Sequence, residues 1–220
     1  MSLFLHSFVH LLFIGIIALL PVADPIGAAF MVAPYFSHLS TIEKRQAVGK
    51  ISIYAFFICM VSLIAGHWIL EFFGISIPVV RIAGGIMICK MGWEFLSSDK
   101  QEEGPDEAMK LSGYKNIEDK LFYPITFPVT TGAGTISVLF TLSAESTSPD
   151  ISEYLINTGA IFLSIIILCL VIYLVFLNTK TVISYLGSHG EKIVNRMIAF
   201  LTFCVGLQIA ATGIKTLFKI

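Results

Sequence analysis

Residues 160–177 form an unbroken run of 18 residues, AIFLSIIILCLVIYLVFL, that contains no charged side chain. A helix of this length measures about 27 Å, close to the roughly 30 Å hydrocarbon core of a bilayer. The rest of the chain has the same character, because 56% of its 220 residues are hydrophobic and only 13% are charged, roughly half the charged share of soluble domains. The sequence therefore predicts an all-α membrane protein in preference to a soluble protein with one buried helix.

Hydropathy windows of about 19 residues predict six transmembrane segments. These are 3–36, 51–72, 77–96, 121–144, 156–177 and 197–217. Charged residues are concentrated between the third and fourth segments, which divides the chain into a first three-helix repeat (1–98), a polar cytoplasmic linker (99–120) and a second three-helix repeat (121–220). Because each half has an odd number of segments, the second half enters the membrane in the opposite sense, and we expect two inverted repeats.

Lysine and arginine predict the orientation in the membrane. They concentrate in the first, third and fifth connections, as Lys44, Arg45, Lys50, Lys100, Lys110, Lys115, Lys120, Lys180 and Lys192. The positive-inside rule places these connections in the cytoplasm and both termini outside. No lysine or arginine precedes the first apolar run, which continues past Asp24, so we expect a mature segment rather than a cleaved signal peptide.

The first apolar segment is interrupted by the sequence PVADPIG at residues 21–27. As one straight helix, segment 3–36 would measure about 51 Å, far longer than the hydrocarbon core is thick. Pro25 has no backbone N–H and disfavours helical backbone at Asp24, so the break is expected there. Asp24 would then be the N-cap and Pro25 the first residue of a second half-helix, with Gly27 admitting close approach.

The second half contains a matching interruption, YPITFPVTTGAGTIS, at residues 123–137. Pro124 and Pro128 repeat the spacing of Pro21 and Pro25, and a stretch of small residues follows each pair. We expect the two prolines to end one half-helix, and Thr130 or Thr131 to cap the next. The candidate binding residues on this side are Pro128, Thr130, Thr131, Gly132, Gly134 and Thr135.

Two half-helices that begin near the bilayer midplane would present unpaired N–H groups and positive dipole ends, which a carboxylate can satisfy. Irregular backbone at this depth is tolerated only where it is buried in protein or lines a cavity. Paired interrupted helices at corresponding places indicate the binding site of a secondary transporter. The alternative is that the prolines only kink the helices and the glycines only allow close packing.

Three stretches of the chain resemble the MarC family, to which the SnatA-type small neutral amino acid transporters belong. They are PVADPIGAAF (21–30), FGISIPVVRIAGGIMI (73–88) and FPVTTGAGTIS (127–137). The resemblance implies a multi-pass protein of a bacterial or archaeal inner membrane, with six helices in two inverted repeats. It also implies that a small amino acid such as glycine or alanine binds between the two breaks.

Two positions depart from the family pattern. Asp24 stands where relatives commonly have Asn, and Gly132-Ala133-Gly134 stands where they often have Gly-Pro-Gly. These departures leave the exact substrate and the coupling ion open.

The function expected from these features is secondary transport by alternating access, with Asp24, Pro25 and Gly27 binding from the first break. No nucleotide-binding motif is present, so H⁺ or Na⁺ is the expected coupling ion and no other cofactor is expected. An acid near the midplane is costly to bury, which makes Asp24 the candidate for ion coupling. Two alternatives stay open: Asp24 is only an N-cap, and the protein is a passive pore or a non-transporting membrane scaffold.

Other classes of function find no support in the sequence. A net charge of −1 without a basic patch argues against nucleic acid binding. No metal-ligand spacing, no pair of acids on facing segments and no buried Ser-His pair suggests an enzyme. The expected partners are the small-molecule substrate and the lipid bilayer, and the oligomeric state is left open.

The remaining polar and sulfur-containing residues receive structural assignments. Lys90 and Glu94, four residues apart, are expected to form a helical ion pair. Arg81 and Arg196 are expected to anchor helix starts at the membrane interface. The four cysteines lie in apolar runs without C-x-x-C spacing and are expected to pack or face lipid, namely Cys59, Cys89, Cys169 and Cys204.

Overall fold

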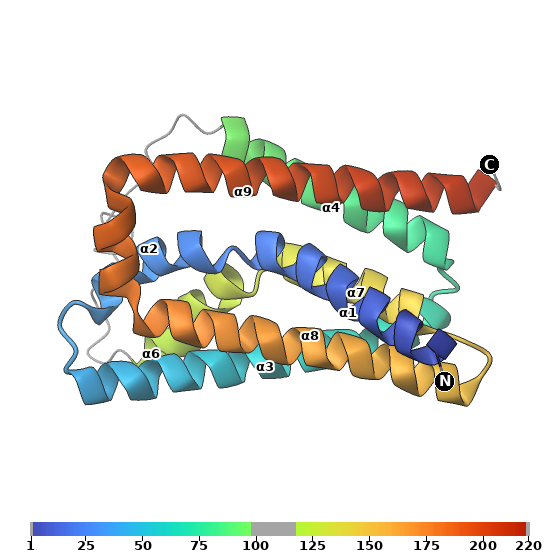
Figure 1. Cartoon of the computed structure of the whole chain (residues 1–220), viewed down its shortest axis with the longest axis horizontal. Coiled ribbons are helices and arrows are strands. Elements are labelled where there is room, and N and C mark those ends of the chain that lie inside the picture. Colours follow the sequence, from blue (N-terminus) through green and yellow to red (C-terminus); the bar gives the residue numbers. More distant parts are fainter. Residues whose placement is uncertain (1, 98–117, 219–220) are drawn as a thin grey trace.

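The computed structural model describes residues 2–97 and 118–218, and all regular structure in these ranges is helical (Figure 1). The elements are α1 (Ser2–Ala23), α2 (Pro25–Phe36), α3 (Thr41–Phe72), α4 (Ile77–Ser97), α6 (Glu118–Lys120), η1 (Leu121–Thr130), α7 (Ala133–Ser146), α8 (Ile151–Leu177) and α9 (Thr179–Phe218). The predicted all-α class is therefore confirmed. The predicted linker, 99–120, lies outside the described residues except for its last three.

Three of the described helices are long and apolar enough to cross a membrane. They are Thr41–Gly66 within α3, Ile151–Leu177 and Arg196–Phe218 within α9. Two bent pairs raise the number to five if each pair counts as one span: Phe8–Ala23 with Pro25–Phe36, bent by 40°, and Leu121–Thr130 with Ala133–Ser146, bent by 63°. The remaining predicted segment, 77–96, corresponds to helix α4, which carries Arg81, Lys90 and Glu94 in its 21 residues and is not among these candidate spans. Six spans are therefore not confirmed.

Helix α3 begins ten residues earlier than the predicted start at residue 51. The Ser40 side chain accepts a hydrogen bond from the Glu43 N–H at 3.3 Å, and the Glu43 carboxylate accepts one from the Ser40 N–H at 2.8 Å. This capping box satisfies two N–H groups at the helix start, so the helix extends through polar residues that hydropathy assigned to a loop. Lys44 and Arg45 consequently lie in the first turns of α3.

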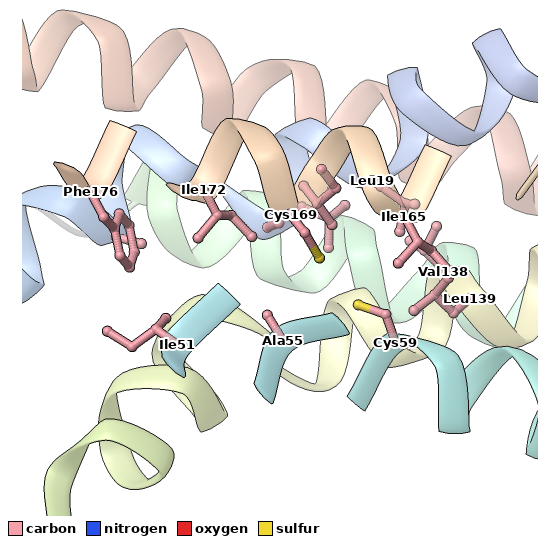
Figure 2. Close-up of a cluster of buried hydrophobic side chains, with 14 of the residues drawn as sticks. Leu19, Ile51, Ala55, Cys59, Val138, Leu139, Ile165, Cys169, Ile172 and Phe176 are labelled. Carbon is pink, nitrogen blue, oxygen red and sulfur yellow. The ribbon is translucent and has the colours of Figure 1, made fainter. Parts of the chain in front are cut away.

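The core lies between α3 and α8, which face each other in Figure 2. Residues four apart on α3, Ile51, Ala55 and Cys59, point toward the α8 face that carries Phe176, Ile172, Cys169 and Ile165; these side chains are at most 9% exposed. The spacing of three or four residues on each helix is that of one helical face. Cys59 and Cys169 are free thiols within this core, so they are packing residues.

Helices α4 and α9 run alongside each other (Figure 1) in a contact made possible by glycines. A Cβ atom added at Gly85 would lie 2.5 Å from the Ala210 nitrogen, and one at Gly206 would lie 2.6 Å from the Cys89 nitrogen. Both values are too short for real atoms, so the two backbones touch only because side chains are missing there. Gly92 and Gly213 continue the same contact along the two helices.

The two termini lie at the same end of the molecule in Figure 1, together with the α3–α4 and α7–α8 connections. The α2–α3 and α8–α9 connections and α6 lie at the opposite end. Apolar side chains are exposed along the helices between the two ends, among them Phe57, Val61, Leu170 and Phe200. Several apolar helices with exposed apolar flanks suit a membrane environment; the side of the membrane on which the termini lie remains a prediction.

Candidate functional site: two helix breaks

The first break is at Asp24, as predicted. Asp24 has φ 38° and ψ 66°, the left-handed conformation that Asp and Asn tolerate better than other side chains. Its carboxylate accepts a hydrogen bond from the Gly27 N–H at 3.0 Å and caps α2, whose first residue is Pro25. The predicted roles of Asp24 as N-cap and Pro25 as first helical residue are therefore confirmed.

Gly27 is needed to accommodate this cap. A Cβ atom at position 27 would lie 2.1 Å from Asp24 Oδ2 and 2.9 Å from its carboxyl carbon. The carboxylate thus lies directly over Gly27, which is buried together with Pro25. An N–H group at the start of α2 is consequently bonded to the carboxylate of Asp24.

The missing N–H of Pro25 leaves the Pro21 carbonyl without its helical donor. The hydroxyl of Thr202, on α9, lies 3.1 Å from the Pro21 oxygen and donates to it. Thr202 is only 1% exposed. Sequence reasoning did not select Thr202, because nothing in the sequence indicates which distant helix packs against the break.

The second break agrees with the prediction in part. The residues before Pro124 and Pro128, Tyr123 and Phe127, have extended, non-helical backbone, so the helix is interrupted in front of each proline as predicted. Extended backbone before a proline follows from the clash of the proline ring with the preceding residue. The change of direction occurs after Thr130, at Thr131 and Gly132, where α7 begins.

Three threonines satisfy the irregular backbone of η1 from within. The hydroxyl of Thr126 donates to the Leu121 carbonyl at 2.6 Å, and that of Thr130 donates to the Ile125 carbonyl at 2.7 Å. The Thr131 hydroxyl and N–H both donate to the Thr126 carbonyl, at 3.0 and 2.8 Å. All three threonines are buried, and each follows a proline by two or three residues, a signal that would have identified Thr126.

The prediction that Thr130 or Thr131 caps α7 is wrong. The N-cap is Gly132, which has no side chain to accept from the helix, and the two hydroxyls are bonded to η1 instead. The first turn of α7 therefore begins with backbone donors that no capping side chain satisfies. Gly134 and Thr135 lie in this turn and are both buried.

Thr135, in this first turn of α7, has a buried hydroxyl group. Its side chain is 1% exposed and its hydroxyl has no hydrogen-bond partner among the described residues. A buried hydroxyl without a partner costs about 1–3 kcal/mol. The N-terminus of α7 thus combines open backbone N–H groups, a positive dipole end and a buried hydroxyl, all suited to an anionic oxygen.

The two breaks occupy the middle of the molecule. In Figure 1, α2 and α7 both start there and run toward opposite ends, and the flanking elements pack together, α1 with α7 and α2 with η1. One break presents a carboxylate and the other an uncapped helix N-terminus, a pairing of opposite electrostatic character. The described residues contain no group of three or more His, Cys, Asp or Glu side chains arranged to hold a metal ion.

Comparison with known proteins agrees with this architecture. The model of the MarC family integral membrane proteins matches residues 9–218. A UPF0056 inner membrane protein MarC from Escherichia coli (strain SMS-3-5 / SECEC) is 28% identical over 214 residues, covering 94% of this chain and 95% of the relative. A protein of the same name from Salmonella typhimurium (strain LT2) is 27% identical over 214 residues, with the same shares covered. No solved structure matches. Because the family model spans nearly the whole chain, this protein belongs to the MarC family of integral membrane proteins.

Proposed function

We propose that this protein is a secondary transporter of small neutral amino acids, of the glycine and alanine type, working by alternating access in the inner membrane. The observation that carries the proposal is the N-terminus of α7, where the buried Thr135 hydroxyl has no partner among the described residues and no side chain caps the helix. A substrate carboxylate supplies the acceptor that these donors require.

The opposite character of the two breaks favours a zwitterion. A neutral amino acid carries a carboxylate, which suits the α7 N-terminus, and an ammonium group, which suits the Asp24 carboxylate. A carboxylate has about four acceptor positions, so the Asp24 side chain can cap α2 and also bind an ammonium group. Pro128, Thr130 and Thr131 then position the α7 N-terminus rather than contact the substrate, since the threonine hydroxyls are bonded to η1.

The proposed mechanism requires two inverted repeats, α1–α4 and η1–α9, with α4 as the sixth span. In this assignment α1 corresponds to η1, α2 to α7, α3 to α8 and α4 to α9. The helix contacts support it, because a contact in one arrangement has its counterpart in the other. The contact of α1 with α8 corresponds to that of η1 with α3, α2 with α8 corresponds to α7 with α3, and α2 with α9 corresponds to α7 with α4; all six contacts are present. Rocking of one repeat against the other would expose the site to each side in turn.

Uptake into proteoliposomes tests the function. We expect saturable uptake of labelled glycine or alanine that responds to an imposed H⁺ or Na⁺ gradient. Thr135→Val, which removes the hydroxyl at nearly constant volume, should raise the substrate Kd at least several-fold, whereas Thr135→Ser should bind as the parent does. Absence of saturable uptake would contradict transport, and a linear, unsaturable flux would favour the passive pore.

A separate prediction concerns ion coupling by Asp24. Asp24→Asn keeps the side-chain oxygen that caps α2 and tolerates the left-handed backbone, but it cannot bind or release a proton. If Asp24 carries the coupling proton, this variant should exchange labelled substrate across the membrane and fail to accumulate it under a pH gradient. Unchanged accumulation would reduce Asp24 to an N-cap, and Asp24→Ala serves as the control that removes the cap as well.

A further inference from the structure

The two breaks differ in how their unsatisfied carbonyls find donors. In η1 the donors come from the same segment, from threonines five residues along the chain. In the first break the Pro21 carbonyl receives its hydrogen bond from Thr202, 181 residues away on α9. The second break is therefore self-contained, while the first depends on the position of another helix.

The Thr202 hydroxyl has a second acceptor within reach. It lies 2.8 Å from the Ile198 carbonyl of its own helix and 3.1 Å from the Pro21 carbonyl. A hydroxyl has one proton, so these two bonds are alternatives or share it. If α9 moves away from α1, the hydroxyl keeps a bond to Ile198, whereas the Pro21 carbonyl loses its donor.

From this geometry we propose that Thr202 is a positioning residue that fixes the first break and makes its conformation depend on α9. Because α9 is joined to α4 along the contact of Gly85, Gly92, Gly206 and Gly213, a displacement of this helix pair reaches Asp24 through the Pro21 carbonyl. The bond is releasable, since its donor retains a partner when it opens. A consequence for transport rests on the function proposed above; the structural coupling does not.

Hydrogen exchange in lipid nanodiscs, resolved to single amides, tests the coupling directly. Three amides report on the first break: Asp24 donates to the Leu20 carbonyl, Gly27 to the Asp24 carboxylate and Ala28 to the Asp24 carbonyl. Thr202→Val should speed their exchange about three- to tenfold, the effect of losing one hydrogen bond. Thr202→Ser, which keeps the hydroxyl, should leave them as in the parent, and Thr202→Ala carries the same comparison if the valine variant does not fold.

The controls separate this role from general loosening. Thr212→Val removes a hydroxyl of the same helix that donates to the Gln208 carbonyl of that helix, and it should not change exchange at the first break. The amides of Thr131 and Ile136, which donate to Thr126 and Gly132 at the second break, should be unaffected by Thr202→Val. Unchanged exchange at Asp24, Gly27 and Ala28, or an equal rise at both breaks, overturns the proposal.

Transport measurements on the same variants extend the test. We expect Thr202→Val to lower kcat more than it raises KM, because it changes how the first break follows α9 while the Asp24 carboxylate and the α7 donors are retained. We expect Thr202→Ser to restore the parent values. If the parent protein shows no saturable uptake, the transport function fails while a positive exchange result stands. If the parent protein shows saturable uptake and Thr202→Val leaves amide exchange at the first break unchanged, the role of Thr202 fails and the transport function stands.

Discussion

Asp24 meets two requirements at one residue. Its backbone turns through the left-handed region, and its side chain reaches forward to cap α2. Asp and Asn can do both, whereas Ser and Thr cap well but tolerate this backbone less readily and Gly tolerates it but supplies no cap. The residue type at position 24 is thus restricted even without any role in ion coupling.

Gly27→Ala tests the cap from the opposite side. The new methyl group would overlap the Asp24 carboxylate, so the side chain must leave its position over the first turn. We expect the free energy of unfolding to fall by about 0.5–2 kcal/mol, the usual contribution of an N-cap. Thermal unfolding in detergent or nanodiscs measures the change.

Gly159→Ala is the matched control for this variant. Gly159 lies within α8 and a Cβ atom there would meet nothing within 4 Å. Alanine favours a helix interior by up to about 1 kcal/mol over glycine, so this variant should be neutral or more stable. Equal behaviour of the two alanine variants would contradict the role given to Gly27.

At the scale of single elements, an ion pair joins the outer parts of α4 and α7. Arg81 Nε lies 3.1 Å from Glu145 Oε1, and their side chains are 18% and 21% exposed. The Nε group makes no well-directed hydrogen bond, so the attraction is mainly electrostatic. The sequence predicted that Arg81 anchors its helix start at the membrane interface; the structure adds an ionic partner, Glu145, from the other half of the chain.

Glu145→Gln should therefore lower the free energy of unfolding by about 1–3 kcal/mol, because it leaves a mostly buried guanidinium without its counter-charge. The exchange of both residues, Arg81→Glu with Glu145→Arg, should recover part of that loss. Chemical or thermal unfolding of the three proteins provides the measurement.

The control for this prediction is an exposed ion pair on α4, the helix that carries Arg81. Lys90 and Glu94 form the predicted ion pair at 3.7 Å, with side chains 69% and 60% exposed. Exposed pairs contribute little, so Glu94→Gln should change stability by less than about 1 kcal/mol. An effect as large as that of Glu145→Gln would mean that burial of the pair is not what matters.

The breaks also show what the sequence can and cannot predict at this scale. Pro25 and Asp24 predicted the first break correctly because proline chemistry and N-capping are local. Pro124 and Pro128 likewise predicted the interruptions at Tyr123 and Phe127. They did not predict the 63° bend after Thr130 or the support of the η1 carbonyls by Thr126, Thr130 and Thr131. Thr202 and Glu145 were missed because their partners lie on helices distant in sequence, and periodicity does not specify which helices meet.

At the scale of the whole molecule, the described helices form a core around α3 and α8 and an attached pair, α4 with α9 (Figure 1). The core is held by large apolar side chains, the pair by glycines at which the backbones touch. Hydropathy predicted these helices. It did not predict that glycines hold α9 against α4, because the hydropathy pattern does not show which distant helix a glycine contacts.

Gly206→Ala should destabilise the contact between α4 and α9, although alanine favours a helix more than glycine does. The added methyl group would lie 2.6 Å from the Cys89 nitrogen and 2.8 Å from the Gly85 oxygen, and backbone cannot move aside as a side chain does. We expect a loss of about 1–3 kcal/mol, as for overpacking elsewhere, measured by thermal unfolding. Gly49→Ala, in α3 with nothing within 4 Å, should show no such loss.

The different origins of the donors at the two breaks have a consequence for assembly of the protein. Every hydroxyl bond that supports η1 is made between residues five apart, so this break can form as soon as its own segment enters the membrane. The Pro21 carbonyl, in contrast, receives its hydrogen bond from Thr202 on α9, the last helix of the chain. A nascent chain that has inserted only its first half therefore holds its first break without the donor from α9, and that break acquires its final support only when the last helix is in place.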